Sequence, residues 1–499
     1  MNIFVNANAR EKHSVFWQCC IMVLLIGCTA VQAEPPDPFS TQGLVAATPA
    51  AGVNSSPLPA PCTPEPKPAT ALSLADVVER ALCNNPQTQE VWANARLQAA
   101  QLGVAESARL PSLSVNGTVS RNWPDDSTKS PDGIAATDYT QRSANVALTY
   151  LLYDFGGRAA NVENARQILS AANASQDAVI QSVFLAAVQA YYQYLATEAA
   201  LTAAREAERF AQESLKVATA RYHVGAATPA DKLQAQTAYS QAVLNRIRVE
   251  GDSKIAQGAL ANSMGMDANQ PLILMPPITR APDTQFDSDI GKLIEVARRQ
   301  RPDLVAAEAQ VNAAHASVDA AKASGLPSIS LAGIRNYTDR DTNITSISNN
   351  SALGITVSIP LFTGFNTSYR IRAAQEQVAA RLAQREQVRQ QIALDVWKAY
   401  QNLTTESQAA RSSTDLVASA TESYRVAAGR YKAGVGTILD LLTAQSALAS
   451  AQQQNVQALY NWYVAKATLA QAMGQLDFST LDTTAGKALD TLQPSLKTP

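Results

Sequence analysis

The sequence predicts a mainly α-helical protein with a small β-component of four strands. Three observations predict this fold class. The chain repeats itself once, so its elements come in two matching sets. Each set contains a helical segment of roughly 65 residues without a helix-breaking residue, far longer than the usual helix of a globular domain. Each set also contains two segments in which apolar and polar residues alternate, as they do in β-strands.

The composition agrees with long helices that pack through small side chains. Of the 499 residues, 16% are charged and only 6% are aromatic, while alanine and glutamine are abundant in the central segments. The net charge is -2 and no block of basic residues occurs, so nucleic acid is not an expected partner. After residue 33 no run of about 18 apolar residues appears, so no conventional transmembrane helix is expected.

The N-terminus predicts an export signal over residues 1–33. Basic residues such as Arg10 precede an apolar stretch, and small residues ending at Ala33 form a cleavage site at the usual distance from it. An alternative interpretation is a lipoprotein signal, because Leu25-Ile26-Gly27-Cys28 fits the motif that places a lipid on Cys28. Both interpretations predict export from the cytoplasm.

Residues 34–72 are rich in proline and alanine, which predicts a disordered leader. Once the signal is removed, Cys62 and Cys83 remain. In an oxidising periplasm such a pair is expected to form a disulfide that ties the leader to the first helix. Two free thiols are the alternative, because a sequence does not supply the geometry that a disulfide requires.

The internal repeat defines the organisation of the chain. Arg109–Ser114 returns as Gly325–Ser330, and Arg221–Gly225 returns as Arg430–Gly434. The predicted divisions are repeat 1 over 73–265, a linker over 266–288, repeat 2 over 289–474 and a C-terminal tail over 475–499. The spacing between the copies shortens because the loop around 124–142 is longer than its counterpart around 339–351, as expected for a surface loop.

Both repeats contain the same elements in the same order. Repeat 1 has a helix over about 75–109, strands over 111–123 and 145–155, a long helix over 157–221, a tight turn and a helix over 229–265. Repeat 2 has a helix over about 291–324, strands over 327–338 and 353–362, a long helix over 366–431, a tight turn and a helix over 437–474. The shorter helices are about half as long as the long ones, so two of them could lie end to end beside one long helix.

The long helices carry coiled-coil spacing. Small and apolar residues follow a 4-3-4 pattern in both copies, at Val183, Ala187, Ala190 and Tyr194 and at Ile392, Val396, Ala399 and Leu403. The sequence therefore predicts long helices packed side by side.

The strands alternate in a way that is typical of membrane β-barrels. In the first strand Leu113 and Val115 fall on one face, and Ser114 and Asn116 fall on the other. The same alternation fits an ordinary half-buried sheet. Four strands with one apolar face leave two open edges, so closure needs several chains, and three chains would supply twelve strands.

Several motifs resemble those of the TolC family of outer-membrane channel proteins, from about Leu72 to Gly474. They are Leu74-Ala75-Asp76, Asn85-Pro86, the two Leu-Pro-Ser strand entries, the strand exit Leu152–Arg158, and the Arg-Tyr-x-x-Gly turn followed by Thr-x-x-Asp in both copies. The resemblance implies long periplasmic helices that form a coiled-coil helical barrel. It also implies a homotrimer whose protomers each contribute four strands to a shared transmembrane β-barrel in the outer membrane.

The resemblance also implies a function. Family members dock onto a periplasmic adaptor (a membrane fusion protein) and an inner-membrane transporter, driven by ATP in the ABC class or by protons, and the barrel meets outer-membrane lipid. The leader and Ala81–Pro86 are most similar to the branch that serves type I toxin secretion, such as the cyclolysin export channel. Multidrug efflux is the alternative within the family, and a soluble periplasmic coiled-coil scaffold or adaptor is the alternative from another class.

Candidate functional residues lie at the two tight turns. Gly225 and Gly434 permit the chain reversal, and the resemblance implies that these turns contact the adaptor; a plain helix stop is the alternative. Tyr222 and Tyr431 precede the turns as packing residues or as elements of a gate.

The resemblance also implies a ring of carboxylates at the tunnel constriction, formed by Asp440, with Asp231 at the matching position of repeat 1. Three such groups on one axis would favour cations and raise one another's pKa. Both residues also fit helix-capping boxes, which is compatible with a ring. The chain departs from the family pattern at Thr443, where a second acid is expected, and at Gly436, where a locking arginine can occur.

No catalytic, cofactor or metal site is predicted. The three histidines, His13, His223 and His315, have no metal-ligand spacing with a cysteine or with one another. No hydrolase nucleophile motif occurs, so an enzyme is not expected.

Overall fold

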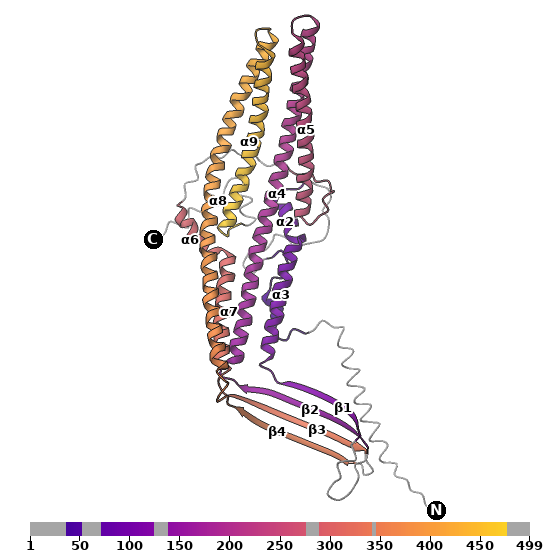
Figure 1. Ribbon diagram of the computed structural model, residues 1–499, viewed down its shortest axis with the longest axis vertical. Coiled ribbons are helices and arrows are strands. Elements are labelled where there is room, and N and C mark those ends of the chain that lie inside the picture. The colour runs from indigo at the N-terminus through magenta and orange to yellow at the C-terminus, as the bar shows by residue number, and fades with distance from the viewer. Residues whose placement is uncertain (1–35, 52–70, 124–137, 276–288, 342–345, 477–499) are drawn as a thin grey trace, which may run out of the picture.

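The computed structural model describes residues 36–51, 71–123, 138–275, 289–341 and 346–476. Two helices of 67 residues each, α4 (Gly157–His223) and α8 (Asn366–Lys432), run along most of the length of the molecule. A four-stranded sheet lies at one end, and two helix-to-helix turns lie at the other end (Figure 1). The two repeats predicted from the sequence therefore form two similar halves that lie side by side.

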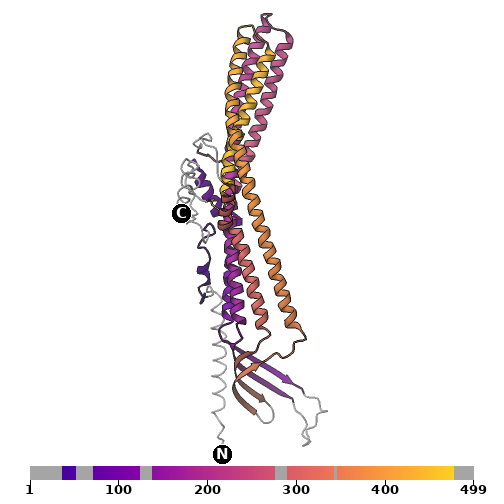
Figure 2. The same ribbon diagram turned by 90° about the vertical axis from the view of Figure 1, so that its left-hand side faces the viewer.

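The shorter elements are arranged around the two long helices. Near the turns, α4 pairs with α5 (Pro229–Ser263) and α8 with α9 (Ile438–Ala472). The remaining elements are the 3-10 helix η2 (Thr41–Leu44), α2 (Leu74–Asn84), α3 (Pro86–Ser107), β1 (Ser112–Asn122), β2 (Tyr139–Tyr153), α6 (Ile290–Gln300), α7 (Pro302–Ala323), β3 (Ser328–Asp341) and β4 (Ser346–Ser358). Figure 2 shows the same molecule turned, with the helices as a narrow column.

The coiled-coil prediction for the long helices is confirmed. Val183, Ala187 and Tyr194 of α4 are buried, and the four matching positions of α8, from Ile392 to Leu403, are buried as well. Many of the buried residues around them are alanines, so the helices approach closely with little side-chain volume between them. Among the described residues, no helix combines the length and the apolar character needed to cross a membrane.

The helices that precede the strands differ from the prediction. Each was expected to be continuous, but the first breaks into α2 and α3 at Asn85, and the second breaks into α6 and α7 at Arg301. Both residues precede a proline, which disfavours the helical conformation in the residue before it. Asn85 and Arg301 have extended backbones, with ψ of 128° and 121°, and the chain resumes its helix at the proline.

The breaks lie where the half-length helices meet. At Gly265, just after α5, an added Cβ would lie 2.7 Å from the carbonyl oxygen of Asn84. At Gly474, just after α9, an added Cβ would lie 3.1 Å from the carbonyl of Gln300. Both glycines have positive φ, 70° and 75°. Only glycine lets the end of one helix approach the start of the next so closely, and the predicted end-to-end arrangement is built on this contact.

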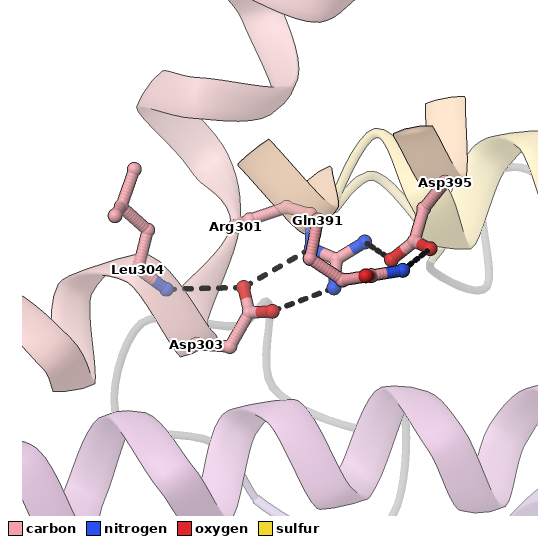
Figure 3. A network of polar contacts seen from close by, with 5 residues as sticks. All are labelled: Arg301, Asp303, Leu304, Gln391 and Asp395. Atoms are coloured by element: carbon pink, nitrogen blue, oxygen red, sulfur yellow. Dashed lines mark hydrogen bonds and ion pairs between the residues drawn. The ribbon is translucent and has the colours of Figure 1, made fainter. Parts of the chain in front are cut away.

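The two junctions are held by different polar contacts. In repeat 2, Arg301 forms ion pairs with Asp303 at 2.6 Å and with Asp395 of α8 at 3.2 Å (Figure 3). Gln391 donates to the same Asp395 carboxylate at 2.7 Å. The Arg301 side chain is only 12% exposed, so its charge depends on these partners. In repeat 1 the neutral Asn85 stands at the matching position, and its side chain accepts from the backbone N–H of Gln87. The buried Thr88 hydroxyl donates to the carbonyls of Leu82 and Asn85, at 2.9 and 2.7 Å.

The sheet is antiparallel, in the order β1-β2-β3-β4, and its two outer strands have unpaired edges. Its register places Leu113 opposite Leu148, Leu148 opposite Gly333, and Gly333 opposite Leu353. Most of the large apolar residues of the four strands therefore share one face, with Ile334 of β3 on the other. Within one protomer these side chains stay uncovered: Leu113 is 68% exposed and Leu353 is 73% exposed.

The strand boundaries differ from the prediction in the second strand of each hairpin. β2 begins at Tyr139 and β4 at Ser346, earlier than expected, because their polar first halves still pair with β1 and β3. These residues lack the apolar alternation on which the prediction depended. β4 also ends earlier than expected, at Ser358, two residues before Pro360, which has no N–H for a ladder.

Part of the predicted disordered leader is ordered. Residues 36–51 lie along α3 and α4, where Val45 and Ala50 are buried. Side chains of the two helices donate to backbone carbonyls of the leader: Trp92 to Ala46 at 2.8 Å, Asn173 to Leu44 at 3.0 Å and Gln176 to Ala51 at 3.1 Å. These contacts offset the entropy lost on ordering a proline-rich segment. The predicted signal over 1–33, with Cys28, lies outside the described residues.

The junction network predicts a measurable asymmetry in stability. We expect Asp395→Asn to lower the free energy of unfolding by about 1–2 kcal/mol, because Arg301 keeps its burial and loses one of its two carboxylates. Asp319→Asn is the control, since its ion pair with Lys322 is exposed and should contribute less than about 0.5 kcal/mol. Thermal unfolding of the purified protein in detergent measures both, and equal effects would contradict the network's role.

Candidate functional site

The candidate site is the pair of turns at the end of the helices opposite the sheet. Gly225 and Gly434 both have positive φ, 75° and 80°, as the predicted turns require. After each glycine the chain folds back, with Ala226 donating to the carbonyl of Arg221 and Val435 to that of Arg430. Glycine thus closes each hairpin with a short turn. Contact between these turns and an adaptor stays a prediction.

Asp231 and Asp440 cap the helices that follow the turns. In both copies the threonine side chain accepts from the aspartate backbone N–H, and the aspartate carboxylate accepts from the threonine backbone N–H. Hydrogen bonds from the side chain and backbone of Thr437 lower the pKa of Asp440. Within one protomer the cap therefore keeps this carboxylate ionised, the opposite of the effect expected within a ring.

The two tyrosines before the turns have different environments. Tyr431 is only 4% exposed and packs with residues of both hairpins, among them Ala218 of α4 and Leu441 of α9. Tyr222 is 37% exposed, and the ammonium of Lys232 lies 5.5 Å from its ring. Tyr431 is thus a packing residue between the hairpins, while Tyr222 lies on the surface.

Arg221 connects the two hairpins and was not among the predicted site residues. Its Nη1 donates to the carbonyl oxygen of Tyr431 at 2.8 Å, and its guanidinium lies 4.9 Å from the centre of the Tyr431 ring. A Cβ added at Gly434 would come within 3.0 Å of its Nη2. The Arg-Tyr pair before each turn is visible in the sequence. The contact itself joins Arg221 of repeat 1 to Tyr431 of repeat 2, and a repeat pattern does not show which residues of the two copies meet.

Gly436 leaves no room for a side chain in the present turn. An added Cβ would lie 3.0 Å from the Cβ of Arg430 and 3.1 Å from the backbone nitrogen of Tyr431. An arginine at this position would force the turn to shift. The turn therefore excludes the arginine that can occur at position 436 in the family pattern. The two hairpins are linked through Arg221 instead.

The predicted cysteine pair lies partly outside the described residues. Cys83, near the end of α2, is disulfide-bonded. Cys62 lies outside the described residues, so its pairing with Cys83 stays a prediction. In the described part of the chain no group of three or more His, Cys, Asp or Glu side chains could hold a metal ion.

A comparison with known protein families matches the chain twice. The model of the outer membrane efflux protein family matches residues 77–266 and residues 293–475. These segments correspond to the two halves of the fold and together cover most of the chain.

The chain belongs to the outer membrane efflux protein family.

Characterised relatives extend over nearly the same length. Protein CyaE of Bordetella pertussis is 30% identical over 425 residues, which cover 85% of this chain and 88% of the relative. The outer membrane protein TolC of Vibrio cholerae is 24% identical over 427 residues, which cover 83% of this chain and 94% of the relative. The predicted resemblance to the TolC family is thereby confirmed.

Solved structures share the fold. The CmeC outer membrane channel of Campylobacter jejuni has a TM-score of 0.72 at 19% identity, covering 83% of this chain and 88% of that one. The MtrE outer membrane channel of Neisseria gonorrhoeae, in its open state, has a TM-score of 0.66 at 22% identity, covering 81% and 89%. The family and the fold make this chain an outer-membrane channel protein with a periplasmic helical tunnel and a β-barrel, and not an enzyme.

The Arg221 link predicts an effect on the conductance of the channel. We expect Arg221→Gln to favour separation of the hairpins about tenfold, because it removes a hydrogen bond and a cation–π contact that together contribute roughly 1.5 kcal/mol. Conductance in planar bilayers should rise accordingly. Arg425→Gln is the control, since its ion pair with Glu422 is exposed on the other hairpin, in α8. Unchanged conductance in Arg221→Gln would show that the link does not hold the tip closed.

Proposed function

We propose that this chain is the outer-membrane channel of a tripartite export system, a passive conduit that leads from an inner-membrane transporter to the cell exterior. The observation that carries the proposal is the sheet. Its apolar face is exposed over all four strands, with Val115 and Ile355 both 67% exposed, and it is joined directly to helices long enough to extend through the periplasm. A soluble scaffold would have no use for such a face.

The active form is a homotrimer in this proposal. The sheet leaves the edges of β1 and β4 unpaired, and a strand edge with an apolar face needs a partner. Pairing β4 of one protomer with β1 of the next closes the sheet, and three copies give twelve strands, a number found in membrane barrels. The polar faces of the strands would then line the lumen.

The partners follow from the position of the turns. The tip at Gly225 and Gly434 lies at the end of the helices farthest from the sheet, so in a channel fixed in the outer membrane it extends toward the inner membrane. We assign the contact with a periplasmic adaptor to this tip. The transporter behind the adaptor, of the ABC or the proton-driven class, supplies the energy that a passive conduit lacks.

Type I protein secretion is the favoured role within this proposal. It is supported by the relative CyaE, which is 30% identical, and by the similarity of the leader and Ala81–Pro86 to the toxin-secretion branch. Multidrug efflux is the second candidate, because relatives that are 23% identical include the toluene efflux pump outer membrane protein TtgC of Pseudomonas putida.

Planar-bilayer recordings test the channel itself. We expect discrete conductance steps with a preference for cations, and Asp440→Ala should weaken that preference because it removes a carboxylate near the tunnel mouth.

The pH dependence of the cation preference identifies the dominant environment of Asp440. If the cap dominates, its lowered pKa keeps the cation preference until the pH falls below the usual aspartate range. If the ring dominates, the preference fades at higher pH. Unchanged selectivity in the variant would exclude Asp440 as the filter.

Gene deletion distinguishes the two kinds of cargo. For type I secretion, we expect a secreted protein to disappear from the culture medium while sensitivity to antibiotics and detergents stays within about twofold of wild type. The full-length gene should restore secretion, and a variant with Arg221→Gln should restore it at least in part. A large gain in drug sensitivity with normal secretion would instead assign the chain to multidrug efflux.

A further inference from the structure

The register of the sheet defines which residues share its apolar face. Leu113, Leu148, Gly333 and Leu353 lie opposite one another across the four strands. Because side chains alternate along a strand, the odd-numbered residues of β1, β3 and β4 lie on this face. The even-numbered residues of β2 lie on it as well, up to the register shift after Leu151. We call it the apolar face.

Arginines follow the apolar residues on this face. Moving along each strand away from the helices, the first charged residue on the apolar face is Arg121 in β1, Arg142 in β2 and Arg335 in β3. In β4 the residues after Leu353 on this face are Ser351 and Asn349, which are polar and neutral. Three of the four strands therefore change from apolar residues to an arginine.

The three arginines lie on a diagonal across the sheet. Arg142 pairs with Val119, two residues before Arg121, and Arg335 pairs with Val146, four residues nearer the helices than Arg142. The main run of apolar residues follows the same diagonal, because it extends to Val119 in β1 but is interrupted in β4 after Leu353, which lies in the row of Leu113. Beyond two polar residues, β4 carries one more apolar residue on this face, Ile347.

The diagonal of arginines corresponds to one level in a membrane. Strands of membrane barrels tilt by about 35–45° from the barrel axis, so a diagonal across the strands can run parallel to the membrane plane. The arginines then form a belt along the edge of the apolar band that faces away from the helices. In an outer-membrane channel whose helices lie in the periplasm, that edge meets the outer leaflet.

The arginine side chains are available to a ligand. The Arg142 side chain is 53% exposed, and Arg121 and Arg335 are exposed as well. Asp339 holds Arg142 through one ion pair of 3.5 Å and is itself only 8% exposed, so it orients the guanidinium and leaves other donors free. Asp341 is a carboxylate on the same face, at the end of β3 and beyond the belt.

The opposite face shows no such belt. In the four strands as described, its charged residue is Arg340, which donates to Gln141 at 3.2 Å and lies 5.5 Å from the ring of Tyr139. The basic residues are therefore concentrated on the face that also carries the exposed apolar side chains. Trp123, 69% exposed and 5.9 Å from the guanidinium of Arg121, adds an aromatic ring at the same level.

We propose that Arg121, Arg142 and Arg335 bind the phosphate groups of a phosphorylated glycolipid of the outer leaflet, whose acyl chains lie along the apolar face. The inference rests on the proposed function, because it needs this face to contact lipid. Guanidinium groups match phosphate oxygens in geometry and charge, and the apolar residues directly below supply the surface for the acyl chains. A face that only contacted hydrocarbon would have no need for aligned arginines.

Lipid binding by the full-length protein in neutral detergent tests the inference. Native mass spectrometry would compare diphosphoryl lipid A with the same lipid after removal of both phosphates. We expect wild type to prefer the phosphorylated form by at least about tenfold at low salt, with the preference decreasing as salt rises. The triple variant Arg121→Gln, Arg142→Gln, Arg335→Gln should reduce the preference below about twofold.

Two further variants make the result specific. Arg340→Gln removes an arginine at the same end of the sheet but on the opposite face, and it should leave the preference unchanged. Arg335→Gln alone keeps the pair of Arg142 and Asp339 intact and should reduce the preference about two- to fivefold even if the triple variant assembles poorly. Equal binding of both lipids by wild type, or an equal loss in Arg340→Gln, would overturn the inference.

Planar-bilayer conductance of the same preparations separates this inference from the proposed function. Channels that conduct normally but show no phosphate preference would refute the lipid site and leave the channel in place. Protein that forms no channels would refute the proposed function instead.

Discussion

The fold depends on a sheet that one chain cannot complete. Its four strands satisfy one another's backbone groups internally, but β1 and β4 keep unpaired edges and the apolar face stays exposed. Water is a poor environment for such a face, and hydrocarbon is a poor environment for an unpaired edge. Further copies of the chain satisfy the edges, and lipid satisfies the face. The membrane location and the oligomer therefore follow from the same constraint.

The helices extend the molecule far from the sheet with few residues. Two helices of 67 residues each supply the length, and buried alanines let their neighbours lie close. The half-length helices lie end to end beside the long ones, and glycine makes their junctions possible. An added Cβ would lie 2.7 Å from the Asn84 backbone at Gly265 and 3.1 Å from the Gln300 backbone at Gly474, and both glycines have a positive φ that other residues rarely adopt.

Much of this fold could be predicted from the sequence, because long regular elements leave strong periodic patterns. The long helix predicted over 157–221 is Gly157–His223, and the alternating strand residues share one face as expected. The breaks at Asn85 and Arg301 were missed although both precede a proline, since the helical pattern continues on either side. The ordered leader and the Arg221 contact were missed because both depend on residues far apart in the chain.

The difference between the two junctions has a mechanical consequence. Within one chain, the joint at Arg301 is held by ion pairs with two carboxylates, whereas the joint at Asn85 is held by neutral hydrogen bonds of the Asn85 side chain and the Thr88 hydroxyl. A tube assembled from three such chains would alternate firm and compliant joints around its circumference. The resistance of the tube to bending would have threefold rather than sixfold symmetry. Widening of the tube would begin at the three Asn85 joints, which lack an ion pair.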